Sequence, residues 1–274
     1  MVSKQYRRFV TPWGVAVNAV HRADTNDFNT LSSCLQEDEY RIASLPPAIR
    51  LDGTILNAID IGGHIGGCTL ALLSRGYKVI TVEPLPENMD MIAESVGLNG
   101  WDARWRSVHG AISDVRGKPV TVAYGDTTTE SGQHHEFIGV TTGIYSENAA
   151  KGCRTVEVRG VSIGELVEMC DDRAGWIEAG QKPPFSDGMV EFLKIDCEGA
   201  EWEAFGNVSP YTLDKIKVLT AELHPLSTTK DIRAEFTALL FNKFDDISVQ
   251  VYPYIAAYGK GATTNAYYTR KNVT

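Results

Sequence analysis

Five residues that can carry a charge or exchange a proton lie in or just after short apolar runs: Asp60, Glu83, Asp196, Glu222 and His224. A carboxylate can accept hydrogen bonds from hydroxyl groups or balance a cationic ligand, and a histidine with an ordinary pKa near 6.5 can take a proton at neutral pH. The apolar runs alternate with helical patterns, which predicts a doubly wound, mostly parallel α/β sheet. Because ligands of such sheets bind beyond the carboxyl ends of the strands, we expect these residues to meet at one rim.

A glycine-rich turn follows the first run, with Gly62, Gly63, Gly66 and Gly67. These glycines let the backbone turn sharply and bring a helix N-terminus against a ligand. In the dinucleotide fingerprint a glycine stands where this chain has His64, and a side chain there crowds a diphosphate. S-adenosylmethionine (SAM) has no phosphate, and an acid such as Asp60 can hold its cationic amino acid end. The turn therefore favours SAM over NAD.

Several further phrases accompany this turn: Glu83-Pro84, Leu98-Asn99, Leu193-Lys194-Ile195-Asp196-Cys197-Glu198-Gly199-Ala200-Glu201, Glu222-Leu223-His224-Pro225 and Asn265-Ala266-Tyr267-Tyr268. With them the chain resembles the FkbM family of SAM-dependent methyltransferases over residues 56–268. The family's phrases are D-x-G-A-N-x-G, E-P, L-N, L-K-I-D-x-E-G-x-E, E-x-H-P and N-x-x-F or Y. The resemblance implies a Rossmann-like class I methyltransferase fold and transfer of a methyl group to an oxygen of a small-molecule or sugar-like acceptor.

The resemblance and the strand-end rule together predict a SAM site lined by Asp60, Gly62, His64, Gly66, Glu83, Ala111 and Asp196. Glu83 would bind the ribose hydroxyls, although it could instead only neighbour the N-terminus of the next helix. Asp60 would orient the turn and balance the amino end of SAM. His64 replaces the family's asparagine; an imidazole can donate a similar hydrogen bond, or it could merely cap the helix or face solvent.

A hydroxyl acceptor must lose its proton during transfer, so the site needs a base. His224 is our candidate, with Glu222 two positions earlier to orient it and Asp196 able to share the role. Alternatively His224 is a hydrogen-bonded turn residue. A divalent ion held by these three side chains is possible but not favoured. We interpret residues 134–136, His-His-Glu, as part of a lid over the substrate rather than as a metal site.

Composition narrows the class of protein. The 274 residues carry a net charge of −9 without clustered Lys and Arg, so nucleic acid is an unlikely partner. The five cysteines form no C-x-x-C pair and the sequence has no long apolar run, so we expect a soluble cytoplasmic protein with no membrane partner. The sequence does not predict the oligomeric state. Three alternatives stay open: a non-catalytic SAM-binding module, an NAD-dependent oxidoreductase, and an RNA ribose methyltransferase, which would need a basic groove and two lysines beside the acids.

The sequence predicts one domain with additions: an N-terminal cap over residues 1–50 and a methyltransferase domain over residues 51–274 with an insertion at about 115–188. We predict strands at residues 55–61, 78–83, 105–112, 189–196, 216–223, 247–252 and 266–268. A hairpin strand at 120–124 should pair with the third of these, a loop should cover 125–152, and a further strand should span 155–161. Helices are predicted at residues 32–43, 66–75, 86–98, 162–170 and 229–241.

Overall fold

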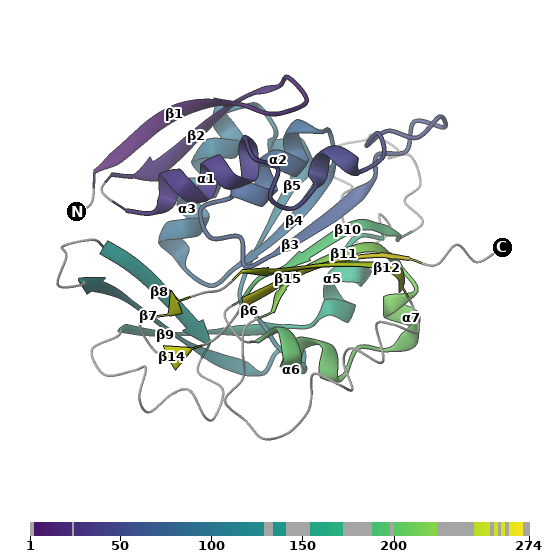
Figure 1. Ribbon diagram of the computed structural model, residues 1–274. Helices are drawn as coiled ribbons and strands as arrows, with labels where there is room; N and C mark the ends of the chain where they lie inside the picture. The colour runs from purple at the N-terminus through teal and green to yellow at the C-terminus, as the bar shows by residue number, and fades with distance from the viewer. Residues whose placement is uncertain are drawn as a thin grey trace.

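The computed structural model describes residues 3–23, 25–128, 134–140, 154–171, 188–197, 200–223, 244–252, 255–256, 259–260 and 263–270. Its centre is a seven-stranded sheet in the order β12-β15-β11-β10-β3-β4-β5 (Figure 1). The bounds are β3 Asn57–Ile61, β4 Lys78–Glu83, β5 Trp105–His109, β10 Val190–Ile195, β11 Ile216–Leu223, β12 Phe244–Tyr252 and β15 Thr263–Arg270. From β11 to β5 neighbouring strands are parallel, and β15 runs antiparallel to both of its neighbours. The predicted doubly wound, mostly parallel sheet is confirmed.

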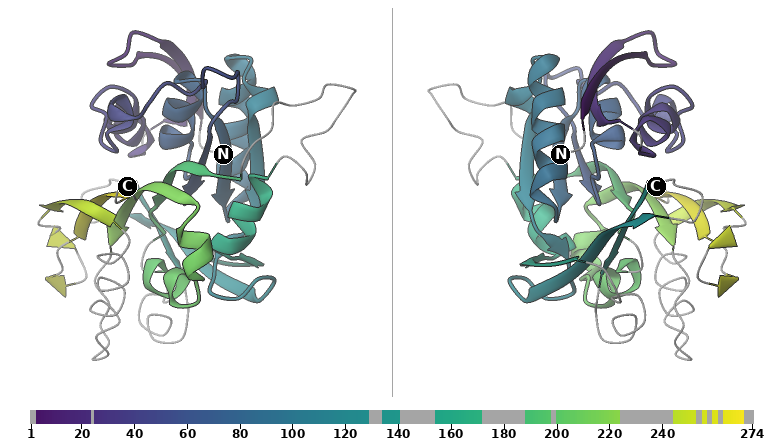
Figure 2. Two further views of the ribbon diagram at one scale, coloured as in Figure 1. Left: turned by 90° about the vertical axis from the view of Figure 1, so that its right-hand side faces the viewer. Right: turned by 90° about the vertical axis from the view of Figure 1, so that its left-hand side faces the viewer.

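Helices cover both faces of this sheet, as Figures 1 and 2 show. On one face lie α1 (Asp27–Leu35), α2 (Gly67–Ser74) and α3 (Pro86–Leu98), which share an apolar core with Ala58, Val79 and Phe192. On the other face lie α5 (Ile163–Met169), α6 (Glu201–Gly206) and α7 (Pro210–Leu213), which pack with Ile59 and Leu193. Successive strand residues point to opposite faces, so every position of β3, β4 and β10 is buried.

The N-terminal cap contains elements that the sequence did not predict. Strands β1 (Lys4–Val10) and β2 (Ala16–Arg22) form an antiparallel hairpin that packs against α3, where the Val20 N–H donates to Ser95 Oγ at 2.9 Å. The predicted helix at residues 32–43 is wrong in its bounds, because α1 begins at Asp27 and ends at Leu35. Left-handed backbone at Asp38 and Arg41 stops the helix, and only the short turn η1 (Ile42–Ser44) follows.

The insertion forms a second, four-stranded sheet in the order β6-β9-β7-β8. Its strands are β6 Ala111–Ile112, β7 Pro119–Thr128, β8 His134–Val140 and β9 Arg154–Val161. The single strand predicted at 105–112 is divided at Gly110, where a Cβ atom would lie 2.6 Å from the Arg159 carbonyl oxygen. The predicted pairing of residues 120–124 is also wrong, because β7 pairs with β8 and β9 instead.

The loop predicted at 125–152 is wrong over the part that the structure describes. The end of β7 and all of β8 lie in it, and His134, His135 and Glu136 belong to β8. These residues are therefore part of a sheet, and a role as a lid over the substrate stays a prediction. The predicted helix at 229–241 lies outside the described residues, as does Glu198. The remaining described elements are the turn η2 (Asp102–Arg104) and a small pair, β13 (Ile255–Ala256) and β14 (Gly259–Lys260). No described helix is long and apolar enough to cross a membrane.

Candidate functional site at the carboxyl ends of the strands

The glycine turn after β3 ties three strands together. The N–H groups of Gly62 and Gly63 both donate to the Val82 carbonyl of β4, each at 3.0 Å. Gly62 has a φ of +78°, and a Cβ atom on it would lie only 1.7 Å from the Asp196 carbonyl oxygen at the end of β10. The main chain that follows β10 passes so close to the turn that position 62 has no room for a side chain, so this position requires glycine. Gly66, at the end of the turn, is the N-cap of α2 and packs against Ile92 of α3.

Beneath this turn lies a lysine that the sequence reasoning did not assign to the site. The Lys194 Nζ donates to the Gly62 carbonyl at 2.7 Å and lies 3.4 Å from both Asp60 Oδ1 and Asp196 Oδ2. Asp60 is fully buried, and its Oδ2 accepts from Thr69 Oγ1 at 2.7 Å. Lys194 pairs in register with Asp60, which places the ammonium directly beside that carboxylate. A lysine within a largely apolar strand, two positions before an acid, was the available signal.

The charges around Lys194 do not cancel. Burial acts to lower the pKa of Lys194, but the carboxylates of Asp196 and Asp60 overcome it and hold the pKa well above its ordinary value. Two carboxylates thus share one ammonium, which leaves the end of the sheet with a negative charge. The Asp196 side chain is 23 % exposed, whereas Asp60 is not exposed at all. We call Lys194, Asp60 and Asp196 the charged trio. Asp196 is the member of this trio that a ligand can reach.

Tyr40 of the N-terminal cap closes the trio from above. Its hydroxyl donates to Asp196 Oδ2 at 3.4 Å, and the Lys194 Nζ lies 5.5 Å from the centre of its ring. Burial, with the charge of Asp196, raises the pKa of Tyr40 well above its ordinary value, so the hydroxyl stays protonated. The cap therefore contributes directly to the rim where the predicted site residues meet.

Glu83 is buried, and its carboxylate organises the turn. Its Oε2 accepts from the His64 N–H at 2.7 Å, while its Oε1 accepts from the Leu85 N–H and from Asn88 Nδ2, each at 3.0 Å. Burial raises its pKa despite these bonds, which favour the charged form. A carboxylate has about four acceptor positions, so these three donors leave one, on Oε2, for a ligand.

His64 turns toward the N-terminal cap. Its φ is +49°, and its Nε2 lies 3.4 Å from Arg22 Nη2 and 3.7 Å from Asp27 Oδ1. The imidazole thus contacts a buried ion pair, although the ring remains 29 % exposed. Its main-chain N–H, rather than its ring, makes the contact with Glu83.

The remaining predicted residues are placed as follows. Glu222 is half-buried at the end of β11, beside the strand position that Asp196 continues, because Ile195 pairs with Ala221. Ala111 lies in β6 and packs into the small core of the second sheet. His224 lies outside the described residues, so its pairing with Glu222 stays a prediction. Among the residues that the structure describes, no group of three His, Cys, Asp or Glu side chains is arranged to hold a metal ion.

A family comparison identifies the fold and its chemistry. The methyltransferase FkbM domain matches residues 60–243, a range that begins at Asp60 and covers more than half of the 274-residue chain. The chain belongs to the FkbM methyltransferase family. The protein is therefore a methyltransferase, and its central sheet is the Rossmann-like class I methyltransferase fold.

Solved methyltransferase structures are similar to this chain only at low identity. An rRNA methylase from Streptococcus thermophilus is 8 % identical, with 86 % of this chain and 95 % of that chain covered and a TM-score of 0.44. Human methyltransferase 10 domain containing protein is 11 % identical, with 86 % and 81 % covered and a TM-score of 0.42. The C-terminal domain of precorrin-6Y C5,15-methyltransferase from Rhodobacter capsulatus is 14 % identical, with 82 % and 84 % covered and a TM-score of 0.35. No curated protein sequence matches the chain. The assignment rests on the family match.

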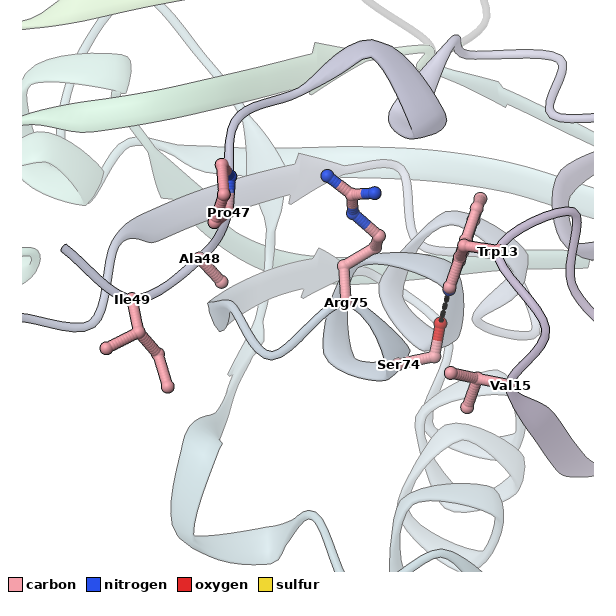
Figure 3. A pocket seen from close by; sticks show the side chains of 7 residues that line it. All are labelled: Trp13, Val15, Pro47, Ala48, Ile49, Ser74 and Arg75. Atoms are coloured by element: carbon pink, nitrogen blue, oxygen red, sulfur yellow. Dashed lines mark hydrogen bonds between the residues drawn. The ribbon is translucent and has the colours of Figure 1, made fainter.

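A cavity of about 430 Å³ lies at the opposite end of α2 from the glycine turn (Figure 3). Its walls are formed by Trp13, Val15, Pro47, Ala48, Ile49, Ser74 and Arg75. Since Ser74 ends the helix that Gly66 begins, this cavity faces the amino ends of the strands. It is shallow and distant from the acids, so we do not assign the methyltransferase chemistry to it.

Proposed function

We propose that this protein moves a methyl group from SAM to an oxygen of a small-molecule or sugar-like acceptor. The observation that carries the proposal is the pair of carboxylates, Asp60 and Asp196, that share the single ammonium of Lys194 beneath the glycine turn. The negative charge left there complements a cationic donor. SAM, when bound, supplies an electrophilic methyl group on a positively charged sulfur.

The described residues fit such a donor. Asp60 Oδ1 has no hydrogen-bond partner among them apart from the ion-pair contact with Lys194; because Asp60 is fully buried, its charge would balance a cationic amino group through space rather than by direct contact. The remaining acceptor position of Glu83 Oε2 suits one ribose hydroxyl, rather than the two-oxygen contact typical of an exposed acid. Glu83 thus binds the donor weakly by itself and acts mainly by holding the turn in place.

At the acceptor end the protein must orient a hydroxyl and remove its proton. Asp196 is partly exposed and fixed by Lys194 and Tyr40, so it can orient an acceptor hydroxyl. We retain His224 as the base that takes the proton, with Glu222 beside Asp196 to orient it. A divalent ion in place of the base is the less favoured form of this proposal.

Two other activities fit less well. An RNA ribose methyltransferase needs a lysine that reaches the incoming hydroxyl, but the Lys194 side chain is 4 % exposed and donates inward to the Gly62 carbonyl. The net charge of −9 also disfavours a nucleic-acid partner. An NAD-dependent enzyme would have to place a diphosphate where His64 stands.

Mass spectrometry of the denatured purified protein should find SAM or S-adenosylhomocysteine, and calorimetry should show that SAM binds. Labelled SAM should then transfer its methyl group to hydroxylated acceptors in a panel of sugars and small alcohols. Retention of NAD in place of SAM would overturn the proposal. Binding of SAM without transfer to any acceptor would instead favour the non-catalytic binding module.

We also propose a cytoplasmic location. Cys34, Cys68 and Cys170 are buried free thiols, and burial raises the pKa of Cys34 and Cys68 well above the ordinary value. Such thiols suit a reducing compartment. Cell fractionation followed by immunodetection tests the location directly.

A further inference from the structure

A buried ion pair of the N-terminal cap lies against the donor turn. The Arg22 side chain donates to Asp27 from Nε to Oδ2 at 2.9 Å and from Nη2 to Oδ1 at 3.0 Å. The Arg22 main-chain N–H also donates to Asp27 Oδ2, at 2.9 Å. The two side chains are 9 % and 2 % exposed, so this two-pronged pair has little freedom to rearrange.

This pair reaches Glu83 through a single residue. The His64 ring contacts both members of the pair, while the His64 N–H donates to Glu83 Oε2. His64 makes this contact with Glu83 while its backbone has a positive φ of +49°, a conformation that disfavours most side chains. The ion pair contacts the ring of this residue, so it is placed to fix the ring while the backbone keeps this conformation.

The sequence supports a role that is particular to this chain. Arg22 and Asp27 lie before residue 60, outside the range that the family match covers. His64 stands where the FkbM phrase has asparagine, a residue that adopts left-handed backbone readily because its short side chain bonds locally. Histidine also adopts left-handed backbone more often than most residues do, but here its longer ring also reaches the Arg22–Asp27 ion pair.

We infer that Arg22 and Asp27 are positioning residues for the donor turn, holding the ring of His64 so that its N–H stays on Glu83. The inference rests on the proposed SAM-binding function, but its first consequence does not need SAM. The alternative is that the ion pair only stabilises the cap. The two explanations differ in one respect: whether the loss of SAM affinity caused by an Asp27 substitution depends on which residue stands at position 64.

The test is a cycle of Asp27→Asn, His64→Asn and the double variant, compared with the wild-type protein. In the ligand-free protein, hydrogen exchange of the His64 amide should be about tenfold faster in Asp27→Asn. Calorimetry should show SAM affinity about tenfold weaker in the same variant, a change of about 1.4 kcal/mol. In the His64→Asn background, Asp27→Asn should change the SAM affinity less than about twofold, because asparagine holds the turn without the pair.

Glu191→Gln is the matched control. It removes a charge from another ion pair, Lys217 Nζ to Glu191 Oε2 at 2.8 Å, at the start of β10 and away from the turn. It should lower the melting temperature without altering His64 exchange or SAM affinity. Asp27→Glu is a second test in case Asp27→Asn does not fold. It keeps a negative charge paired with Arg22, but the longer side chain moves the carboxylate relative to the His64 ring. It should reproduce the faster exchange.

Equal losses of SAM affinity from Asp27→Asn in the wild-type and His64→Asn backgrounds would overturn the inference and leave the pair a purely structural role. Unchanged His64 exchange in both Asp27 variants would overturn it as well. Failure of the wild-type protein to bind SAM would refute the proposed function, and the exchange measurement would then still decide whether the ion pair holds the turn.

Discussion

Replacing Lys194 with methionine tests the charge arrangement on which the site depends. Methionine keeps most of the volume of the side chain but removes the ammonium, which leaves the fully buried Asp60 without its cation and the Gly62 carbonyl without its donor. Removing one partner of a buried pair costs about 3 to 5 kcal/mol. The Lys194–Asp196 contact adds less, because Asp196 is 23 % exposed and water screens it. We therefore expect Lys194→Met to lose about 3 to 5 kcal/mol of unfolding free energy, mostly through Asp60.

Urea unfolding at neutral pH measures this loss as a lower midpoint with an unchanged slope. The double variant Lys194→Met with Asp60→Asn should recover a large part of the loss, since no uncompensated charge then remains buried. Lys4→Met is the control; it breaks an ion pair with Glu94 in which both side chains are accessible to water, 46 % and 32 % exposed, so the loss should be under about 1 kcal/mol. Two results would contradict this prediction. One is a loss below about 1 kcal/mol in Lys194→Met, and the other is a double variant whose loss equals the sum of the two single losses.

Three further predictions concern the site. Glu83→Gln replaces the oxygen that accepts from the His64 N–H with an amide that cannot, so unfolding free energy should fall by about 1 to 3 kcal/mol. Because burial raises the Glu83 pKa, the contribution of Glu83 to unfolding free energy falls as pH rises above about 4.5, so the stability advantage of the wild-type protein over Glu83→Gln should narrow; a gap that widens contradicts this. Asp196→Asn removes the excess negative charge that complements a cationic donor, so SAM affinity measured by calorimetry should fall, and methyl transfer at saturating SAM should fall at least about tenfold; equal activity would remove Asp196 from the acceptor site. His224→Ala should lower turnover by about 10² to 10⁴-fold with no effect of a chelator on the wild-type enzyme, whereas inhibition by the chelator and rescue by Mg²⁺ would favour the metal.

The central elements could be predicted because their local signals agree. The strand at Lys78–Glu83 and the helix at Pro86–Leu98 have the predicted bounds, since a largely apolar β-branched run and a proline at the first helical position leave little choice. The bounds of the helix in the cap could not be predicted, because they depend on two non-glycine residues with left-handed backbone, Asp38 and Arg41, which give no clear sequence signal.

The sequence predicted where some candidate residues lie in the fold, but not which residues they contact. The sequence placed Asp60 and Asp196 at strand ends, but only the register of β3 and β10 shows that Lys194 lies between them. Gly62 was expected to admit a ligand, whereas the atom nearest to its missing side chain is the Asp196 carbonyl oxygen. The Lys194–Asp60 contact and the Gly62–Asp196 contact each join residues more than a hundred positions apart, and no local pattern encodes them.

The hairpin and α1 of the N-terminal cap form one wall of the apolar core that also holds Phe192 of the central sheet. The family match begins only at residue 60, so a designer who cut the gene at that boundary would keep every recognised motif. The resulting protein would lose residues 57–59 of the central strand β3 and would expose the apolar surface that Phe9, Val20, Leu31 and Leu35 now cover. Such a fragment would aggregate, so the unit for expression, domain grafting or directed evolution has to include the first β-hairpin.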